Sequence, residues 1–306
     1  MNGQRFLSAV FPLCPKLTVV YQGGIGNQLF IHAAVIELTE GRGFQLRADV
    51  VSGFEHDSRY KRQYRLDELG IGLPDKESLR LATRKKSLLR HLVKRLLSPC
   101  NIWFKFITDD NLYKHLESSR NFIFNRSFIL EGYFQSSSYS DLTFHRIVKC
   151  IKPQLIYEAK KLYSSLVADS NNAVCIHIRA FEDCDNEEAQ LRSYYGRAID
   201  YFFRLDPSAC FYIIGEKDDV VTRLMRGAKV KYTKIPSSGR SDIQDLLLIS
   251  CFSNIVISQS TFSWWSAKIG QVLGRTQKVV APGSIKVDGN SSWLPDRILP
   301  LDWIRM

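Results

Sequence analysis

The chain has 306 residues, of which 45% are hydrophobic and 24% are charged. This composition excludes a disordered or low-complexity protein, and the length suits two domains whose cores need no disulfide or metal for stability. The net charge of +11, from 42 lysines and arginines against 31 acidic residues, favours anionic partners such as nucleotides, nucleic acid or a phospholipid surface. No apolar run is long enough to cross a bilayer.

The chain opens with a predicted strand over residues 17–21 and a predicted helix over 27–41. The loop between them carries three glycines, Gly23, Gly24 and Gly26. Glycine allows a close backbone approach to a ligand, and the free N–H groups of a helix start attract anions. The loop matches neither the dinucleotide fingerprint nor the P-loop. It is therefore either a plain strand-to-helix turn or a ligand loop, and the amides of Asn27 and Gln28 favour the ligand loop because packing does not require them.

The rest of the N-terminal half is less regular. A strand is expected over residues 44–49, and an irregular, basic stretch follows over 50–125. Within it, residues 84–97 have leucines on one helical face and cations opposite, which suits either an anionic membrane or an ordinary surface helix. A short strand over 128–130 and a helix over 139–149 complete this half.

The C-terminal half alternates strands with helices. Strands are expected over 173–178, 210–214, 230–235, 254–258 and 278–281, and helices over 194–204, 218–225, 242–251 and 262–273. This alternation predicts a doubly wound parallel sheet. With a boundary in the helical linker after residue 150, we expect an α/β protein of two Rossmann-like domains facing a cleft: an acceptor-side domain over 1–160 and a nucleotide-sugar-binding domain over 161–306.

Two strand ends in this half carry polar groups where ligands of such sheets bind. His177 and Arg179 end the strand over 173–178 and project to the same side. Arg179 could hold a diphosphate bidentately, because a charge at the end of an apolar strand needs a partner. His177 is equally compatible with a site role and with a hydrogen-bonded core histidine.

The following loop is acidic, with Glu182, Asp183 and Asp185. Asp183 and Asp185 form the short D-x-D pattern that can hold a divalent cation, but a solvated acidic loop is the simpler interpretation. Either Glu182 or Asp183 could instead act as a general base.

A second strand end, after residue 258, runs into a helix that opens with hydroxyls. Ser260 or Thr261 fits an N-cap, and together with the helix N–H groups they could also hold a phosphate. We expect Trp264 and Trp265 to pack this helix against the sheet. Asp245, earlier in the chain, could pair with a purine edge or could be an exposed helix carboxylate.

The seven cysteines show no C-x-x-C spacing and are odd in number. They are Cys14, Cys100, Cys150, Cys175, Cys184, Cys210 and Cys251. Free thiols in a reducing compartment are the simplest interpretation, with Cys175 and Cys210 buried in strands.

Several of these motifs together resemble the bacterial α-1,2-fucosyltransferases. The motifs are Gly23–Phe30, Gly132–Gln135, His177–Arg179, Tyr194–Ile199 and Ser260–Ala267, and their order and spacing match over residues 17–306. The chain departs from the family pattern after Arg179. Ala180, Phe181 and Glu182 stand where the family has arginine, glycine and aspartate.

The resemblance implies a GT-B-like fold and the transfer of L-fucose from GDP-β-L-fucose to the 2-hydroxyl of galactose, with inversion and without a metal. The acceptor would be an O-antigen or another surface glycan. The residues implied to bind the donor are Gly24, Gly26, Arg179, Asp245, Ser260, Thr261 and Phe262, with Asp245 near guanine. Asn27 would lie near the transferred sugar, and the base would be Glu182, Asp183 or, as a weaker choice, His177.

We therefore expect a cytoplasmic enzyme without nucleic acid as a partner, with peripheral contact to the anionic inner face of the membrane. Two alternatives stay open on the residues alone. One is a metal-dependent glycosyltransferase that uses another nucleotide sugar, and the other is a basic protein that binds nucleic acid or membrane. The ordered motifs disfavour the second alternative.

Overall fold

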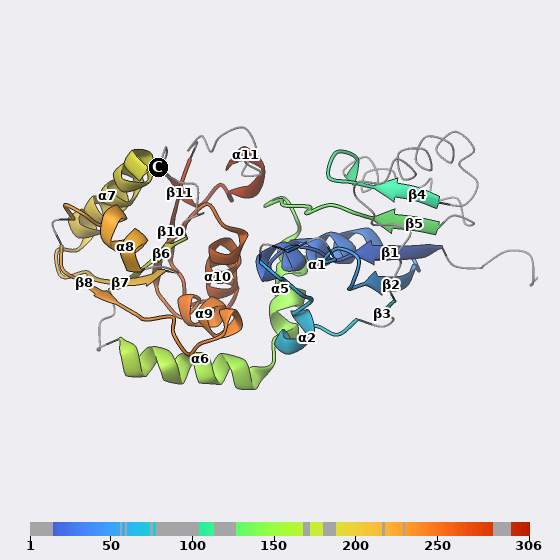
Figure 1. Cartoon of the computed structure of the whole chain (residues 1–306), viewed down its shortest axis with the longest axis horizontal. Coiled ribbons are helices and arrows are strands. Elements are labelled where there is room, and N and C mark those ends of the chain that lie inside the picture. Colours follow the sequence, from blue (N-terminus) through green and yellow to red (C-terminus); the bar gives the residue numbers. More distant parts are fainter. Residues whose placement is uncertain are drawn as a thin grey trace, which may run out of the picture. The chain divides into compact units, whose positions relative to one another are not determined.

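The computed structural model describes residues 15–55, 57–58, 60–73, 76–77, 104–112, 127–167, 172–179, 188–215, 218–228, 230–283 and 295–306. The chain divides into two compact units, Met1–Gln135 and Ser136–Met306. Each unit is built on a parallel sheet, as predicted (Figure 1). The basic stretch over residues 84–97 lies outside the described residues.

The first unit has a five-stranded sheet in the order β3-β2-β1-β5-β4. Its strands are β1 (Lys16–Val20), β2 (Gln45–Asp49), β3 (Lys76–Glu77), β4 (Phe104–Ile107) and β5 (Ser127–Leu130), and its helices include α1 (Ile25–Thr39) and α2 (Leu66–Leu69). β1 pairs with β2 along its whole length and with β5 on its other side, in the register Leu17 to Phe128. The loops that follow β1 and β5 therefore leave the sheet at neighbouring points.

The second unit has a six-stranded sheet in the order β11-β10-β9-β6-β7-β8. Its strands are β6 (Ala173–Ile178), β7 (Cys210–Gly215), β8 (Tyr232–Lys234), β9 (Asn254–Val256), β10 (Lys278–Ala281) and β11 (Ile304–Arg305). Its helices include α5 (Asp141–Cys150), α6 (Pro153–Leu166), α7 (Glu188–Leu205), α8 (Asp218–Leu224), α9 (Asp242–Ile249), α10 (Thr261–Val272) and α11 (Pro295–Ile298). All six residues of β6 are buried, as its mainly apolar sequence predicts.

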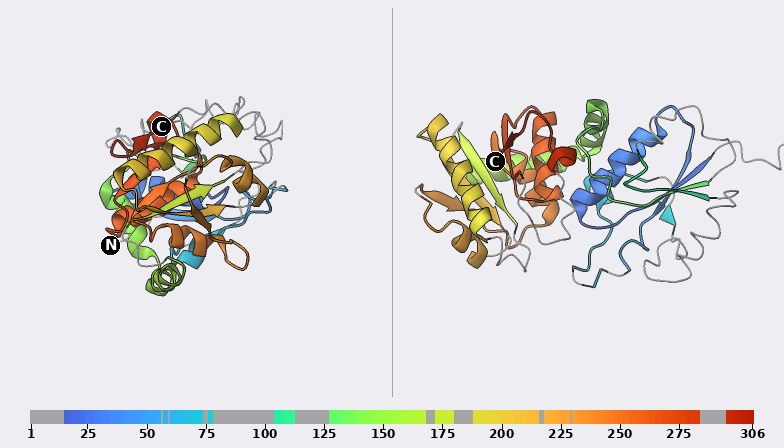
Figure 2. Two further views of the ribbon diagram at one scale, coloured as in Figure 1. Left: turned by 90° about the vertical axis from the view of Figure 1, so that its left-hand side faces the viewer. Right: turned by 90° about the horizontal axis from the view of Figure 1, so that it is seen from above.

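The order of this sheet reverses between β6 and β9. From β6 the chain moves outward through β7 to β8, and from β9 it moves outward through β10 to β11 in the opposite direction. Helices α7 and α8 cover one face of the sheet, while α9 and α10 cover the other (Figures 1 and 2). Open parallel sheets bind ligands at such a reversal, beyond the carboxyl ends of the strands.

The division between the units falls at Gln135, ahead of the boundary near residue 160 that we expected. That expected boundary lies inside α6. Helix α5 packs on α10, where the ring of Phe144 lies 5.8 Å from that of Trp264 and 5.7 Å from that of Trp265. Helix α6 packs in turn on α9. Both helices therefore belong to the core of the second unit.

The same contacts give the tryptophan pair a role that was not predicted. Trp264 and Trp265 are completely buried, and their rings join α10 to α5. The indole N–H of Trp264 donates to the carbonyl of Ile298 at 2.7 Å, and its ring also contacts that of Trp303. The pair therefore ties two helices and the C-terminal segment together.

Four cysteines of the described part are free thiols, as predicted. Cys175 is buried, whereas Cys210 is exposed because it is the first residue of β7, at the amino edge of the sheet. The prediction that Cys210 is buried was therefore wrong. Along the described ranges, no helix combines the length and the apolar character needed to span a bilayer.

Candidate functional site

The reversal between β6 and β9 brings Arg179 to the start of α10. Arg179 directly follows β6, and its Nη1 donates to the Oγ of Ser260 at 3.2 Å. Ser260 is the N-cap of α10, and its Oγ accepts a hydrogen bond from the backbone N–H of Phe262 at 3.2 Å. A guanidinium and a helix N-terminus thus meet at one point. Both attract an anion, so this junction suits a phosphate group.

His177, in β6 two residues before Arg179, is 5% exposed. Its Nδ1 is 3.0 Å from the Oγ of Ser258, which is itself 3.2 Å from the Oγ of Ser263 on α10. The imidazole ring also lies 5.4 Å from the ring of Phe262. Burial, with a smaller contribution from the charge of Arg179, lowers the pKa of His177 to about 3. An imidazole with so low a pKa is a poor general base near neutral pH, so the structure favours a supporting role for His177.

The buried imidazole makes stability depend on pH. An unfolded histidine titrates near pH 6.5, so between about pH 6.5 and pH 3 the unfolded chain binds the proton that the folded chain excludes. The neutral His177 therefore contributes stability that is complete above pH 6.5 and is lost as the pH falls, by at most about 1.4 kcal/mol per pH unit. We expect His177→Asn to reduce this slope in urea unfolding between pH 7.5 and pH 5.

His145 offers the matched control, because it is an exposed histidine on α5. His145→Asn should leave the slope as in the parent protein. Burial lowers the pKa of His32 to about 4. His32 therefore adds the same amount to the pH dependence of stability in the parent protein and in both variants. An unchanged slope in His177→Asn would contradict the assignment of His177 as buried and neutral.

Asp245 lies in the first turn of α9 and has a protein partner. Its Oδ1 accepts from the Nε of Arg240 at 2.5 Å, and both side chains are 13% exposed. Burial raises the pKa of Asp245, and the Arg240 guanidinium opposes that rise. The carboxylate is therefore a half-buried member of an ion pair and not the exposed helix carboxylate that was the simpler expectation.

In the first unit, the glycine loop follows β1, and Gly23 is the residue of this loop with a positive φ. Gly23 has a φ of +75°, whereas Gly24, the N-cap of α1, has an ordinary φ of −72°. A Cβ atom on Gly23 would lie 2.6 Å from the Nδ2 of Asn27 and 3.0 Å from the Cε1 of Tyr133. The Oδ1 of Asn27 accepts from the Nε2 of Gln135 at 3.0 Å. The loop after β1 thus packs on the loop after β5.

Gln28 corrects the expectation that packing does not require the loop amides. Its side chain is completely buried. The Nε2 donates to the carbonyl of Gly23 at 2.9 Å and to that of Gln63 at 3.0 Å, while the Oε1 accepts from the N–H of Arg65 at 2.9 Å. Gln28 is therefore a structural residue that fastens the segment ending at Arg65 to the glycine loop.

The loop after β5 is held by Asp109. Its carboxylate accepts from the backbone N–H groups of Phe134 at 2.6 Å and Tyr133 at 3.0 Å. A Cβ on Gly132 would overlap this carboxylate, and Phe134 has a φ of +52°. The Gly132–Gln135 motif thus forms a tightly held turn that presents the ring of Tyr133 beside Gly23.

The comparisons with known proteins agree with this architecture. No family model matches the chain. The O-antigen biosynthesis glycosyltransferase WbnK of Escherichia coli is 23% identical over 273 residues, which cover 80% of this chain and 87% of that protein. NodZ, an α-1,6-fucosyltransferase soaked with GDP-fucose, matches with a TM-score of 0.53 and 12% identity, over 84% of this chain and 92% of that one. Another NodZ structure, from Bradyrhizobium, matches with a TM-score of 0.50.

A third solved structure, a mutant of Arabidopsis thaliana FUT1 in complex with GDP, matches with a TM-score of 0.50 and 13% identity, over 84% of this chain and 69% of that one. The chain has the GT-B-like fold of fucosyltransferases. In this fucosyltransferase fold, the candidate donor-binding residues Arg179, Ser260, Thr261 and Phe262 gather where β6 and α10 meet. Asp245 stands at the start of α9 in the same unit. Gly24, Gly26 and Asn27 lie in the first unit, at the start of α1.

Three acidic residues of the predicted site, Glu182, Asp183 and Asp185, lie outside the described residues. Where the structure describes side chains, no group of histidine, cysteine and acidic residues could hold a metal ion. Ser258 was not predicted, although its hydroxyl joins His177 to α10. Its position at the end of the strand predicted over 254–258 could have suggested that role.

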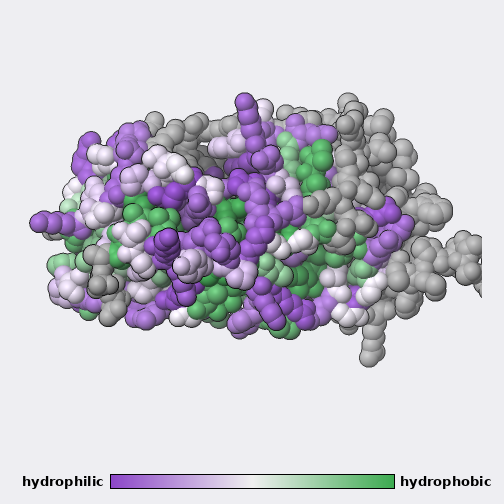
Figure 3. Space-filling view, turned by 90° about the horizontal axis from the view of Figure 1, so that it is seen from below, coloured by the Kyte–Doolittle hydropathy of each residue, from purple (hydrophilic) through white to green (hydrophobic). Residues whose placement is uncertain are grey.

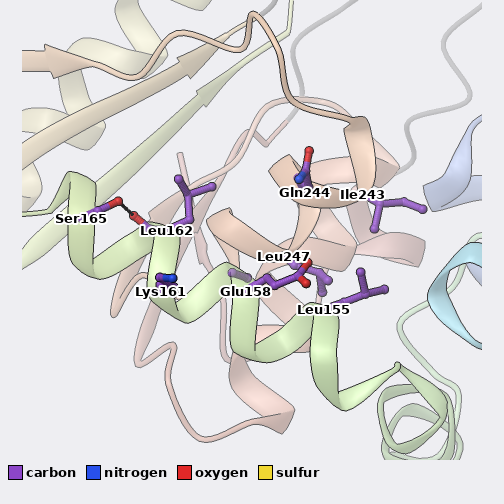
Figure 4. A pocket seen from close by; sticks show the side chains of 9 residues that line it. Leu155, Glu158, Lys161, Leu162, Ser165, Ile243, Gln244 and Leu247 are labelled. Carbon is purple, nitrogen blue, oxygen red and sulfur yellow. Dashed lines mark hydrogen bonds between the residues drawn. The ribbon is translucent and has the colours of Figure 1, made fainter.

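A pocket of about 380 Å³ lies between α6 and α9, away from the junction of β6 and α10. Its lining consists of Leu155, Glu158, Ala159, Lys161, Leu162, Ser165, Ile243, Gln244 and Leu247 (Figure 4). Figure 3 shows the underside of Figure 1, where α6 lies, as a mixture of hydrophilic and apolar patches. The pocket contains none of the predicted site residues.

Proposed function

We propose that the chain is an inverting fucosyltransferase that transfers L-fucose from GDP-β-L-fucose to the 2-hydroxyl of a galactose in an O-antigen or another surface glycan. The junction of Arg179 with the N-terminus of α10, within a fucosyltransferase fold, carries this proposal. The motif resemblance and the O-antigen relative support the acceptor class. The enzyme would act in the cytoplasm.

The reaction is a single in-line displacement. The oxygen of the acceptor hydroxyl bonds to C1 of fucose while the bond from C1 to the diphosphate oxygen breaks, and the electron pair leaves with GDP. Arg179 and the helix N-terminus capped by Ser260 stabilise the negative charge that develops on the diphosphate. The hydroxyl proton passes to a carboxylate, for which Glu182 and Asp183 are the candidates. Asp245 would accept hydrogen bonds from the guanine edge.

The purified full chain should be incubated with GDP-fucose and a panel of galactosides, and the linkage in the product determined by NMR. We expect an α-fucosyl group on O2 of galactose. A product linked at another position would overturn the linkage. A preference for a different nucleotide sugar would overturn the donor assignment.

We further propose that the transfer needs no metal, because arginine and a helix N-terminus can stabilise the leaving diphosphate. Treatment with EDTA should therefore leave the initial rate unchanged. Loss of activity that Mn²⁺ or Mg²⁺ restores would contradict this prediction. It would point instead to a metal site at Asp183 and Asp185.

A further inference from the structure

A short segment of the first unit, residues 57–58 and 60–65, is fixed beside the glycine loop. Gln28 binds the carbonyl of Gln63 and the N–H of Arg65, as well as the carbonyl of Gly23 within the loop. Because the Gln28 side chain is completely buried, these bonds are shielded from water and hold both segments in one arrangement.

This arrangement brings Arg62 to the glycine loop. Its Nε lies 3.8 Å from the position that a Cβ on Gly24 would occupy. Its Nη1 is 3.6 Å from the Oδ2 of Asp57, and its Cζ lies 4.1 Å from the centre of the Tyr60 ring. Within the part of the chain that the structure describes, the guanidinium donates no hydrogen bond, and the side chain is 27% exposed. Its planar donors are thus oriented by neighbours and remain available to a ligand.

Tyr133 adds a second donor to this cluster. Its ring flanks Gly23, and its electrostatic interactions include Arg62, Asp57 and Asp109. Burial raises the pKa of Tyr133, so its phenol stays protonated near neutral pH. A protonated phenol can donate one hydrogen bond and accept others.

We propose that Arg62, Asp57, Tyr60 and Tyr133 bind the acceptor, and that the acceptor unit they recognise is a neutral sugar with adjacent hydroxyls. This inference rests on the proposed fucosyl transfer. A guanidinium beside a carboxylate offers a donor and an acceptor to two neighbouring hydroxyls, and the exposed ring of Tyr60 can cover an apolar sugar face. Asp57 balances the charge of Arg62 and would repel an anionic sugar.

The test compares the full chain with Arg62→Gln and Arg65→Gln. Both variants lose one positive charge within the same segment, but the Arg65 side chain pairs with Glu68. Initial rates give the KM for a galactoside and for GDP-fucose. We expect Arg62→Gln to raise the galactoside KM by about 10- to 100-fold, with the KM for GDP-fucose unchanged. Tyr133→Phe should raise the galactoside KM by a smaller factor, and Arg65→Gln should leave both values unchanged.

An unchanged galactoside KM in Arg62→Gln, or an increase confined to GDP-fucose, would overturn the inference. Failure of the parent chain to use GDP-fucose would instead contradict the proposed function. An NMR titration with lactose and N-acetyllactosamine in the presence of GDP distinguishes a failure of the acceptor site from a failure of the proposed function. Weaker sugar binding by Arg62→Gln supports the acceptor site even if the parent chain does not use GDP-fucose. Equal binding by Arg62→Gln, or no binding by the parent chain, overturns the acceptor site.

Discussion

Arg179→Ala is expected to lower kcat/KM for fucosyl transfer about a thousandfold or more while leaving the fold intact. Arg179 stands at the carboxyl end of β6 and its Nη1 reaches the cap of α10, so in the proposed reaction its charge would lie beside the leaving diphosphate. Removing a pre-oriented donor from such a position typically costs about 10²- to 10³-fold, and removing an arginine that stabilises phosphate charge costs about 10³- to 10⁵-fold. Steady-state kinetics at saturating acceptor measure the change.

Arg197→Ala is the matched control, because Arg197 is exposed on α7 and its Nη1 donates to Ser193. That variant should keep the parent rate. Excess GDP should raise the melting temperature of the parent chain and of Arg197→Ala, but not that of Arg179→Ala. Turnover of Arg179→Ala near the parent rate would exclude Arg179 as the diphosphate ligand.

Gln28→Leu is expected to destabilise the chain by at least about 3 kcal/mol. The substitution leaves the carbonyls of Gly23 and Gln63 and the N–H of Arg65 without their partner, and each buried polar group left unpaired costs about 1–3 kcal/mol. Leucine fits the size of the site, so the loss comes from hydrogen bonds. Equilibrium unfolding in urea measures the free energy of unfolding.

Gln154→Leu makes the same chemical change at an exposed position of α6, where the side chain of Gln154 donates to Glu158. Its effect should stay within about 0.5 kcal/mol. Since Gln28 also fixes the segment that carries Arg62, Gln28→Leu should raise the galactoside KM at a temperature where the variant is folded. Equal stability of the two variants would show that the buried amide does not hold the loop.

The sequence predicts the second unit well because the strands β6, β7, β9 and β10 are largely buried. The apolar runs over 173–178 and 278–281 become β6 and β10 with the predicted bounds, and Ser260 caps α10 as expected. The first residues of the helices are predicted less accurately. Helix α1 begins at Ile25 and not at residue 27, because Gly24 serves as the N-cap through its backbone. Glycine loops give little sequence signal about which glycine takes a positive φ.

The contacts that the sequence does not predict join residues far apart in the chain. Gln28 meets Arg65 across 37 positions, and His177 meets Ser258 across 81. Neither pair follows from strand or helix periodicity, which describes only neighbours within one element. The pairing of Asp245 with Arg240 spans five positions, but it depends on the turn between β8 and α9. These contacts depend on how loops pack, which hydrophobic patterning does not specify.

The inclusion of α5 and α6 in the second unit has a consequence for recombining such enzymes. The aromatic cluster of Phe144, Trp264 and Trp265 comes from one parent only if the exchanged piece starts before Phe144, as a piece that starts at Ser136 does. A chimaera joined near residue 160 would combine two halves of α6 from different parents and separate Phe144 from its tryptophan partners. A crossover between Gln135 and Ser136 would transplant the Arg62 cluster into a new partner with both hydrophobic cores preserved.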